Sequence, residues 1–129
     1  MDIHVEYYQT GAGRTPVQEF LDSLNPKMHD KMKLSIDLLK EHGIHLRAPY
    51  SKPIRDGLFE LRARIGTNLS RIVYYWNSKS SVVFLCGFIK KDQKLSVKEI
   101  LYFRQLRQNH TGTCRRRGRR TAYASSRKS

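Results

Sequence analysis

The chain of 129 residues lacks several features that would place it in other protein classes. No apolar run approaches the roughly 20 residues of a membrane span. The N-terminus lacks the basic-then-apolar pattern of a secretory signal, so we expect a cytoplasmic protein. Cysteine is scarce: Cys86 lies in an apolar stretch and Cys114 in an arginine-rich one, a setting that excludes a disulfide framework and predicts a buried Cys86. His42 and His45 flank an expected helix end and are too few for a metal site, so we expect no metal and no cofactor.

Acidic residues are also scarce. The chain has 25 Lys and Arg against 11 Asp and Glu, a net charge of +14. Positions 104–129 contain no acidic residue and nine basic ones, so positions 1–103 hold 16 basic and 11 acidic residues, a net charge of +5. Both parts favour a polyanionic partner, most simply nucleic acid. The nine basic residues are Arg104, Arg107, Arg115, Arg116, Arg117, Arg119, Arg120, Arg127 and Lys128.

The first 43 residues predict one strand and two helices. Apolar and polar residues alternate over positions 2–8, as in a strand. Thr15–Gln18 has the pattern of a capping box with proline at the first helical position, and this helix should end near Leu24. Asn25–Pro26 then begins a longer helix with apolar residues at helical spacing, which Gly43 should terminate.

Residues 58–91 predict three antiparallel strands joined by two tight turns. In the first strand Phe59, Leu61, Ala63 and Ile65 alternate with charged residues, so the two sets should lie on opposite faces. The third strand, 82–88, is almost wholly apolar, as expected when both faces are covered. One face of the sheet would therefore present a row suited to holding phosphate: Glu60, Arg62, Arg64, Arg71 and Tyr75, with Lys90 and Lys91 at the end of the third strand.

The remaining segments complete the expected fold. Positions 44–57 read as a loop that brings Lys52 and Arg55 to the sheet edge. Ser96–Glu99 is a second capping box and opens a last helix with a buried stripe through Phe103 and Leu106. We expect an α+β domain over residues 1–108, with a small antiparallel sheet of about four strands and the helices on one face. Residues 109–129 show no periodicity and are expected to be a disordered basic tail.

Each candidate residue also has a purely structural interpretation. Arg62 and Arg64 could be solvated strand charges, and Glu60 could simply form an ion pair with a neighbouring arginine, since opposite charges stabilise sheets across strands. Tyr75 could stack on a base or pack in the core, whereas Tyr74 and Trp76 favour the core.

The order of several short motifs resembles one known family, the RelE/ParE toxin superfamily, and most closely its HigB-like, phage-derived branch of type II toxin–antitoxin systems. The similarity covers about residues 1–103. The motifs are 52-KPI-54, 57-GLFELR-62, 70-SRIVY-74, 84-FLCGFIKK-91, Lys94 and 99-EI-100.

This resemblance implies an endoribonuclease that cleaves mRNA on the ribosome, by attack of a ribose 2′-hydroxyl on the adjacent phosphate, and that a HigA-like helix-turn-helix antitoxin inhibits. Such a reaction needs a base, an acid and positive charge at the phosphate. On the matching positions, Arg71 and Lys91 would hold the phosphate, with Lys90 and Lys94 assisting. Glu60, beside Arg62, would accept the proton. Lys52, Arg55, Arg64 and Tyr75 would bind RNA, and ribosomal RNA and mRNA would be the partners.

Two departures and two alternatives remain. Some relatives use histidines, or a tyrosine after the last strand, as acid or base, but this chain has Val97 near that position and no histidine between His45 and His110. The general acid and base therefore stay open. A ParE-like, non-catalytic inhibitor of DNA gyrase is the alternative function, and an RNA-binding protein that acts through its tail is a third. The tail itself could be an rRNA-binding arm or an extension foreign to the fold.

Overall fold

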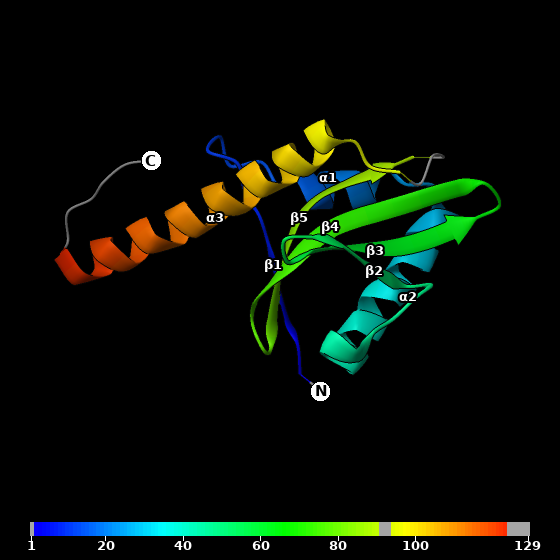
Figure 1. Ribbon diagram of the computed structural model, residues 1–129, viewed down its shortest axis with the longest axis horizontal. Coiled ribbons are helices and arrows are strands. Elements are labelled where there is room, and N and C mark those ends of the chain that lie inside the picture. The colour runs from blue at the N-terminus through cyan, green and yellow to red at the C-terminus, as the bar shows by residue number, and fades with distance from the viewer. Residues whose placement is uncertain (1, 91–93, 124–129) are drawn as a thin grey trace.

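The computed structural model describes residues 2–90 and 94–123, and side chains as far as residue 112. Figure 1 shows a central sheet with helices on either side of it. The expected α+β class is confirmed. The elements in chain order are β1 His4–Tyr7, α1 Pro16–Ser23, α2 Pro26–His42, a 3₁₀ turn Gly43–His45, β2 Ser51–Arg55, β3 Leu58–Ile65, β4 Asn68–Ser78, β5 Ser81–Ile89 and α3 Val97–Tyr123.

The sheet has five strands in the order β1-β5-β4-β3-β2, one more than expected. β3, β4 and β5 are antiparallel neighbours, as predicted. β2 also pairs with β3 in antiparallel fashion, and β1 pairs with β5 in parallel. The extra strand is β2, which lies in the segment interpreted as a loop. Pro53 concealed it, because proline cannot donate to a sheet ladder and is tolerated only on an edge strand such as this one.

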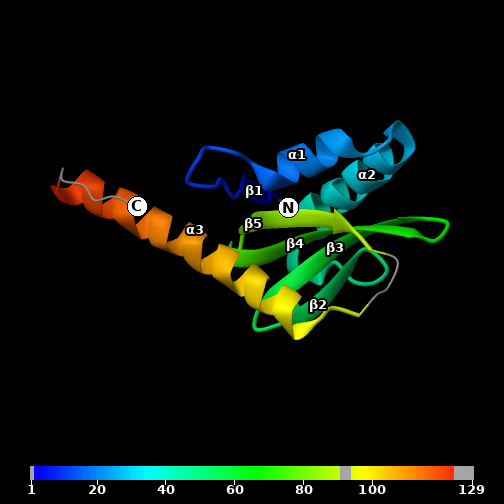
Figure 2. The same ribbon diagram turned by 90° about the horizontal axis from the view of Figure 1, so that it is seen from above.

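The first core lies between the sheet and the helices α1 and α2 (Figure 2). Val17 and Leu21 of α1 and the methionines of α2 pack against Leu61, Ile72 and Phe84. Leu61 belongs to the set that alternation assigned to one face of its strand, so that prediction is confirmed.

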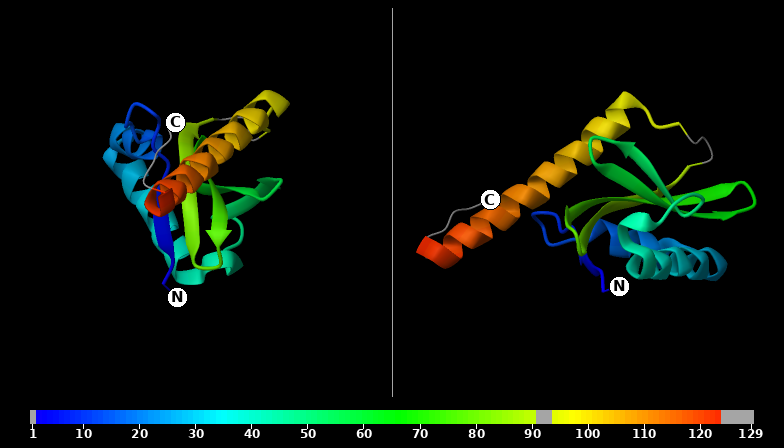
Figure 3. Two further views of the ribbon diagram at one scale, coloured as in Figure 1. Left: turned by 90° about the vertical axis from the view of Figure 1, so that its left-hand side faces the viewer. Right: turned by 60° about the horizontal axis from the view of Figure 1, so that its bottom comes forward.

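The second core lies on the opposite face of the sheet, beneath α3 (Figure 3). Phe103 and Leu106 pack there with Val73, Tyr75 and Leu85. The expectation that all helices share one face is therefore wrong. The reason lies in β5, whose apolar residues face both ways and need cover on both sides.

Two of the three predicted helix starts have the expected caps. The Asn25 side chain accepts from the Met28 amide at 2.9 Å, and Ser96 and Glu99 bond to each other's backbone N–H groups at 3.1 and 2.8 Å. The Thr15–Gln18 box is wrong, because Thr15 makes no side-chain cap and Gln18 donates instead to Asp22.

The last helix runs beyond Gln108, where we expected it to end, and continues to Tyr123. His110 is buried in it and packs its ring against Tyr8 and Tyr75, so the fold extends past the boundary at 108. None of the helices in the described part of the chain is both long and apolar enough to cross a bilayer.

Candidate functional site

A charged cluster forms where β3 and β4 run side by side. Arg62 and Arg71 are direct cross-strand partners, and Glu60 lies two residues before Arg62 on the same face. Two arginines opposite each other repel, and the Glu60 carboxylate offsets this. Its Oε1 lies 3.1 Å from Arg62 Nε and 3.2 Å from Arg71 Nε. One carboxylate oxygen is thus shared by two guanidinium groups.

The cluster is removed from water to an unusual degree. Arg71 is fully buried, with its guanidinium 5.8 Å from the centre of the Phe88 ring, and Glu60 is only 3% exposed. Burial raises the pKa of Glu60 above its ordinary value, against the opposing charges of Arg71, Arg62 and Lys52. Burial likewise lowers the pKa of Arg62, against the Glu60 charge. A carboxylate held this way is a stronger base than a solvated one.

Glu60 is reached from solvent through a small opening of about 240 Å³. Lys52 of β2 lies at its rim together with Lys94, which precedes α3. The opening therefore has two cations at its rim and a carboxylate at its bottom. Such an arrangement attracts an anion and places a base beside it. Its lining residues are Lys52, Pro53, Ile54, Glu60, Lys94, Leu95 and Ile100.

Several other predicted site residues lie away from this opening. Arg55 Nε lies 4.0 Å from Asp56 Oδ2 at the turn after β2. Arg64 is exposed in a separate groove beside α2. Lys90 donates to Glu99 at 2.7 Å and so links the end of β5 to the start of α3. Lys91 lies outside the described residues.

Tyr75 belongs to the core rather than to an open surface. It is buried beneath α3, where the His110 ring meets its edge and the Arg107 guanidinium lies 5.9 Å from its centre. A base could stack on Tyr75 only if α3 moved away. Tyr75 could stack on a base or pack in the core, and the structure shows it packed in the core.

A family model described as "Phage derived protein Gp49-like (DUF891)" matches residues 19–108. The chain belongs to this family. Because the Gp49-like proteins are a clade of RelE-type toxins, the expected membership of the RelE/ParE superfamily is confirmed. The match includes every described residue of the Glu60 opening and the whole of β2 to β5.

A comparison with solved structures finds the crystal structure of an archaeal RelE–RelB complex from Pyrococcus horikoshii OT3. It is 18% identical, covers 73% of this chain and 100% of its own, and superposes with a TM-score of 0.44. No curated protein matches the chain.

One contact of this Gp49-like protein escaped the sequence reasoning. His110 Nε2 lies 3.2 Å from Glu6 Oε2, so that α3 is tied to β1 across the end of the sheet. The signal was present in the spacing, because Phe103, Leu106 and His110 follow one another at three and four residues, on one face of a helix. Ending the helix at Gln108 concealed it.

Proposed function

We propose that this RelE-like toxin, as a HigB-like member of the superfamily, is an endoribonuclease that cleaves mRNA on the translating ribosome. The observation that supports the proposal is the buried Glu60 carboxylate at the base of an opening with Lys52 and Lys94 at its rim. An inhibitor that acts by binding gyrase needs neither a desolvated base nor a cationic mouth.

In the proposed reaction, different residues act as the base, as the acid and as the cations that stabilise the phosphate. Glu60 accepts the proton of the ribose 2′-hydroxyl, whose oxygen attacks the adjacent phosphorus while the bond to the 5′-oxygen breaks. A lysine ammonium, from Lys94 or Lys91, donates a proton to that oxygen. The products are a 2′,3′-cyclic phosphate and a free 5′-hydroxyl. Arg62 and Lys52 stabilise the negative charge on the phosphorane.

Arg71 takes a different role from the one first expected. Since its side chain is fully buried and lies 3.2 Å from Glu60, it fixes the carboxylate and does not hold the phosphate. We therefore treat it as a positioning residue. Lys90, which is bonded to Glu99, would position the start of α3 in the same way.

The partners follow from the proposed class. Membership of a RelE-type toxin family supports an antitoxin partner for this chain. We propose that a HigA-like helix-turn-helix antitoxin inhibits this toxin. Ribosomal RNA and mRNA are the toxin's other partners, and the antitoxin prevents it from acting on them.

Induced expression in bacteria, followed by mapping of mRNA 5′ ends, tests the proposal. We expect cuts within translated codons for the wild type and none for Glu60→Gln, with Lys40→Gln, a distant exposed lysine, cutting normally. Melting curves of the purified variants show whether each one folds. Intact mRNA together with a DNA-damage response would instead support the gyrase inhibitor.

A further inference from the structure

A second concavity, of about 350 Å³, lies between α2 and the far half of β3. Pro49 and Tyr50, from the loop that leads into β2, also line this concavity. β2 pairs with β3 only as far as Leu61, so the groove occupies the space beside residues 62–64 that a longer β2 would fill. The lining residues are Lys31, Leu34, Ser35, Pro49, Tyr50, Arg62, Ala63, Arg64 and Leu69.

The frame of this groove is fixed by hydrogen bonds to one residue. The Arg62 amide donates to the Tyr50 carbonyl at 2.8 Å, and the buried Ser35 hydroxyl donates to the Arg62 carbonyl at 2.8 Å. The loop and α2 are therefore both held to β3 at the same point. Because the backbone around the groove is already fixed, less conformational entropy is lost when a ligand binds.

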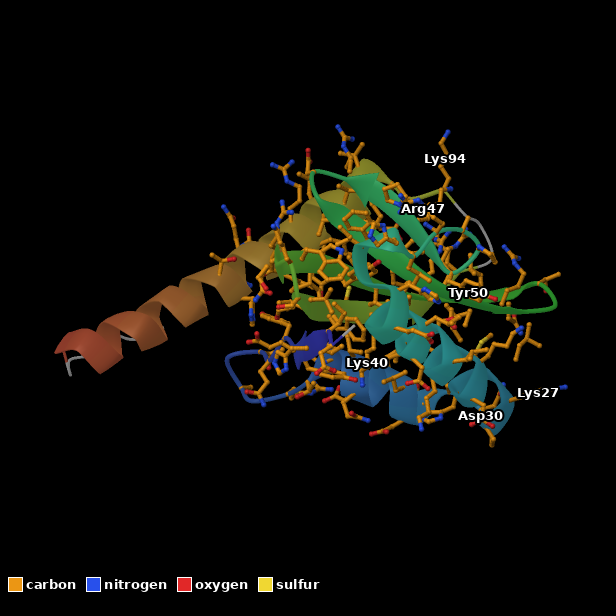
Figure 4. All side chains as sticks on the ribbon, turned by 90° about the horizontal axis from the view of Figure 1, so that it is seen from below. Lys27, Asp30, Lys40, Arg47, Tyr50 and Lys94 are labelled. Carbon is orange, nitrogen blue, oxygen red and sulfur yellow. The ribbon has the colours of Figure 1, made fainter. Side chains whose placement is uncertain are left out.

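The side chains that line this frame combine positive charge with exposed apolar surface. Lys31 and Arg64 are exposed cations, while Tyr50 is 38% and Leu34 51% exposed. No acidic residue is among the lining residues. Cations that track a backbone, with an aromatic ring beside them for a base, are the features that bind single-stranded nucleic acid. Figure 4 shows Tyr50 near α2, with Lys40 apart from it.

Arg62 connects this groove to the proposed active site. It lines the groove, and its Nε lies 3.1 Å from Glu60 Oε1. We propose that the groove binds an unpaired nucleotide of the RNA substrate next to the one that is cut, with its base against Tyr50 and Leu34 and its phosphate between Lys31 and Arg64. This inference rests on the proposed function, since it supplies that reaction with a second subsite.

The backbone bonds argue against a peptide strand as the occupant. A strand added to β3 here would need the outward N–H and C=O of Arg62, and both already bond to Tyr50 and Ser35. An RNA nucleotide needs only the side chains, which remain accessible.

Photo-crosslinking tests the subsite with the full chain. The probe is a short single-stranded RNA with 2′-O-methyl riboses, which cannot be cut, and one 4-thiouridine. We expect the crosslinked peptide to contain Tyr50, and Tyr50→Ala to weaken binding about tenfold by fluorescence anisotropy, whereas Tyr50→Phe keeps the ring and the affinity. Tyr102→Ala is the matched control, since Tyr102 is an exposed tyrosine on α3.

The charge contribution is measured separately. Arg64→Gln should reduce the slope of log affinity against log salt by about 0.7, the value for one phosphate contact on a single strand. Lys40→Gln, on the same helix as Lys31 but outside the groove, should leave the slope unchanged.

The outcomes separate the subsite from the reaction. Glu60→Gln should abolish cutting and leave the Tyr50 crosslink intact. If Tyr50→Ala binds RNA as the wild type does, or if an acidic peptide protects Tyr50 while RNA does not, the subsite is overturned and the nuclease stands. If Tyr50 crosslinks but the wild type cuts no mRNA, the nuclease fails and the groove is an RNA-binding site that does not serve a cleavage reaction.

Discussion

At Glu60 two opposing effects meet within one side chain. Loss of solvent disfavours its charge, and the neighbouring Arg71 and Arg62 favour it. Desolvation is the larger effect, so the pKa of Glu60 is raised. The residue thus remains protonated to a higher pH than a solvated glutamate.

This shift predicts the pH dependence of cleavage. Because the base must be ionised, the acid limb of the rate profile should lie above the ordinary glutamate pKa of about 4.3. Lys52→Gln removes a charge that lowers the pKa of Glu60, so the limb should move further up. Single-turnover cleavage on purified ribosomes measures the limb. An unchanged limb in Lys52→Gln, with Lys40→Gln as control, would contradict the assignment.

Stability should show the coupling between Glu60 and Arg71. Removing one partner of a buried ion pair leaves a buried charge, so Arg71→Met should cost about 3–5 kcal/mol of unfolding free energy. The double variant Glu60→Gln/Arg71→Met should cost less than Arg71→Met alone. Urea denaturation at pH 7 measures both, and additive losses would mean that the two residues do not interact.

For single residues, the sequence predicted on which face of the sheet a side chain lies but not how deeply it is buried. Alternation correctly placed Arg62 and Arg71 with Glu60 on one side of the sheet. It could not show that Arg71 would be fully buried, because that depends on α3 and Phe88, which come from other parts of the chain. The burial of Arg71 is the reason why we propose a positioning role for it instead of the phosphate role first expected.

At the scale of elements, α1 approaches β5 closely at one small residue, Gly87. A methyl group at Gly87 would lie 2.7 Å from Cγ of the Phe20 ring, well inside van der Waals contact. The glycine therefore allows the helix to approach the strand.

Gly87→Ala should consequently destabilise the fold by about 1–3 kcal/mol, since α1 must move away from the sheet. Gly11→Ala is the matched control, because a methyl group there has no neighbour within 4 Å. Thermal unfolding of the two variants gives the comparison. Equal melting temperatures would show that Phe20 adjusts without cost.

The start of α3 depends on a second local arrangement. Ser96 caps the helix, and Glu99 accepts from both the Ser96 amide and Lys90. These bonds, that of Lys90 first, lower the pKa of Glu99. Stabilisation by this carboxylate is therefore present above the ordinary glutamate pKa and is lost as the pH falls through the lowered one.

Ser96→Ala should cost about 1 kcal/mol, the usual cost of losing a cap. Glu99→Gln should be less stable than the wild type at pH 7. The difference should shrink below the ordinary pKa of about 4.3 and vanish once the pH lies below the lowered pKa of Glu99. Denaturation curves across pH test both statements. A difference that persists in acid would indicate that the charge is not what matters.

For the whole molecule, the sequence predicted the α+β class and two of the three antiparallel strand pairings, but it missed β2 in the order of elements. The β3–β4–β5 meander was correct because tight turns and alternation are local signals. The β2 pairing, the parallel β1–β5 pairing and the position of α3 are long-range, and no local pattern specifies them.

The charge at the C-terminal end can be separated from the fold. Deleting residues 113–129 removes seven basic residues (Arg115, Arg116, Arg117, Arg119, Arg120, Arg127 and Lys128) and leaves His110 in place. We expect an unchanged melting temperature and unchanged cleavage sites, with a smaller salt dependence of RNA binding. A lower melting temperature would show that the removed segment supports the core.

The contact between Glu6 and His110 also affects when this protein can finish folding. It joins β1 to α3, the first and the last of the described elements. On the ribosome, β1 and α3 therefore cannot be tied together until His110 has left the exit tunnel. A nascent chain in which β3 and β4 have already emerged still lacks this contact, so the fold is completed only after α3 has emerged as far as His110.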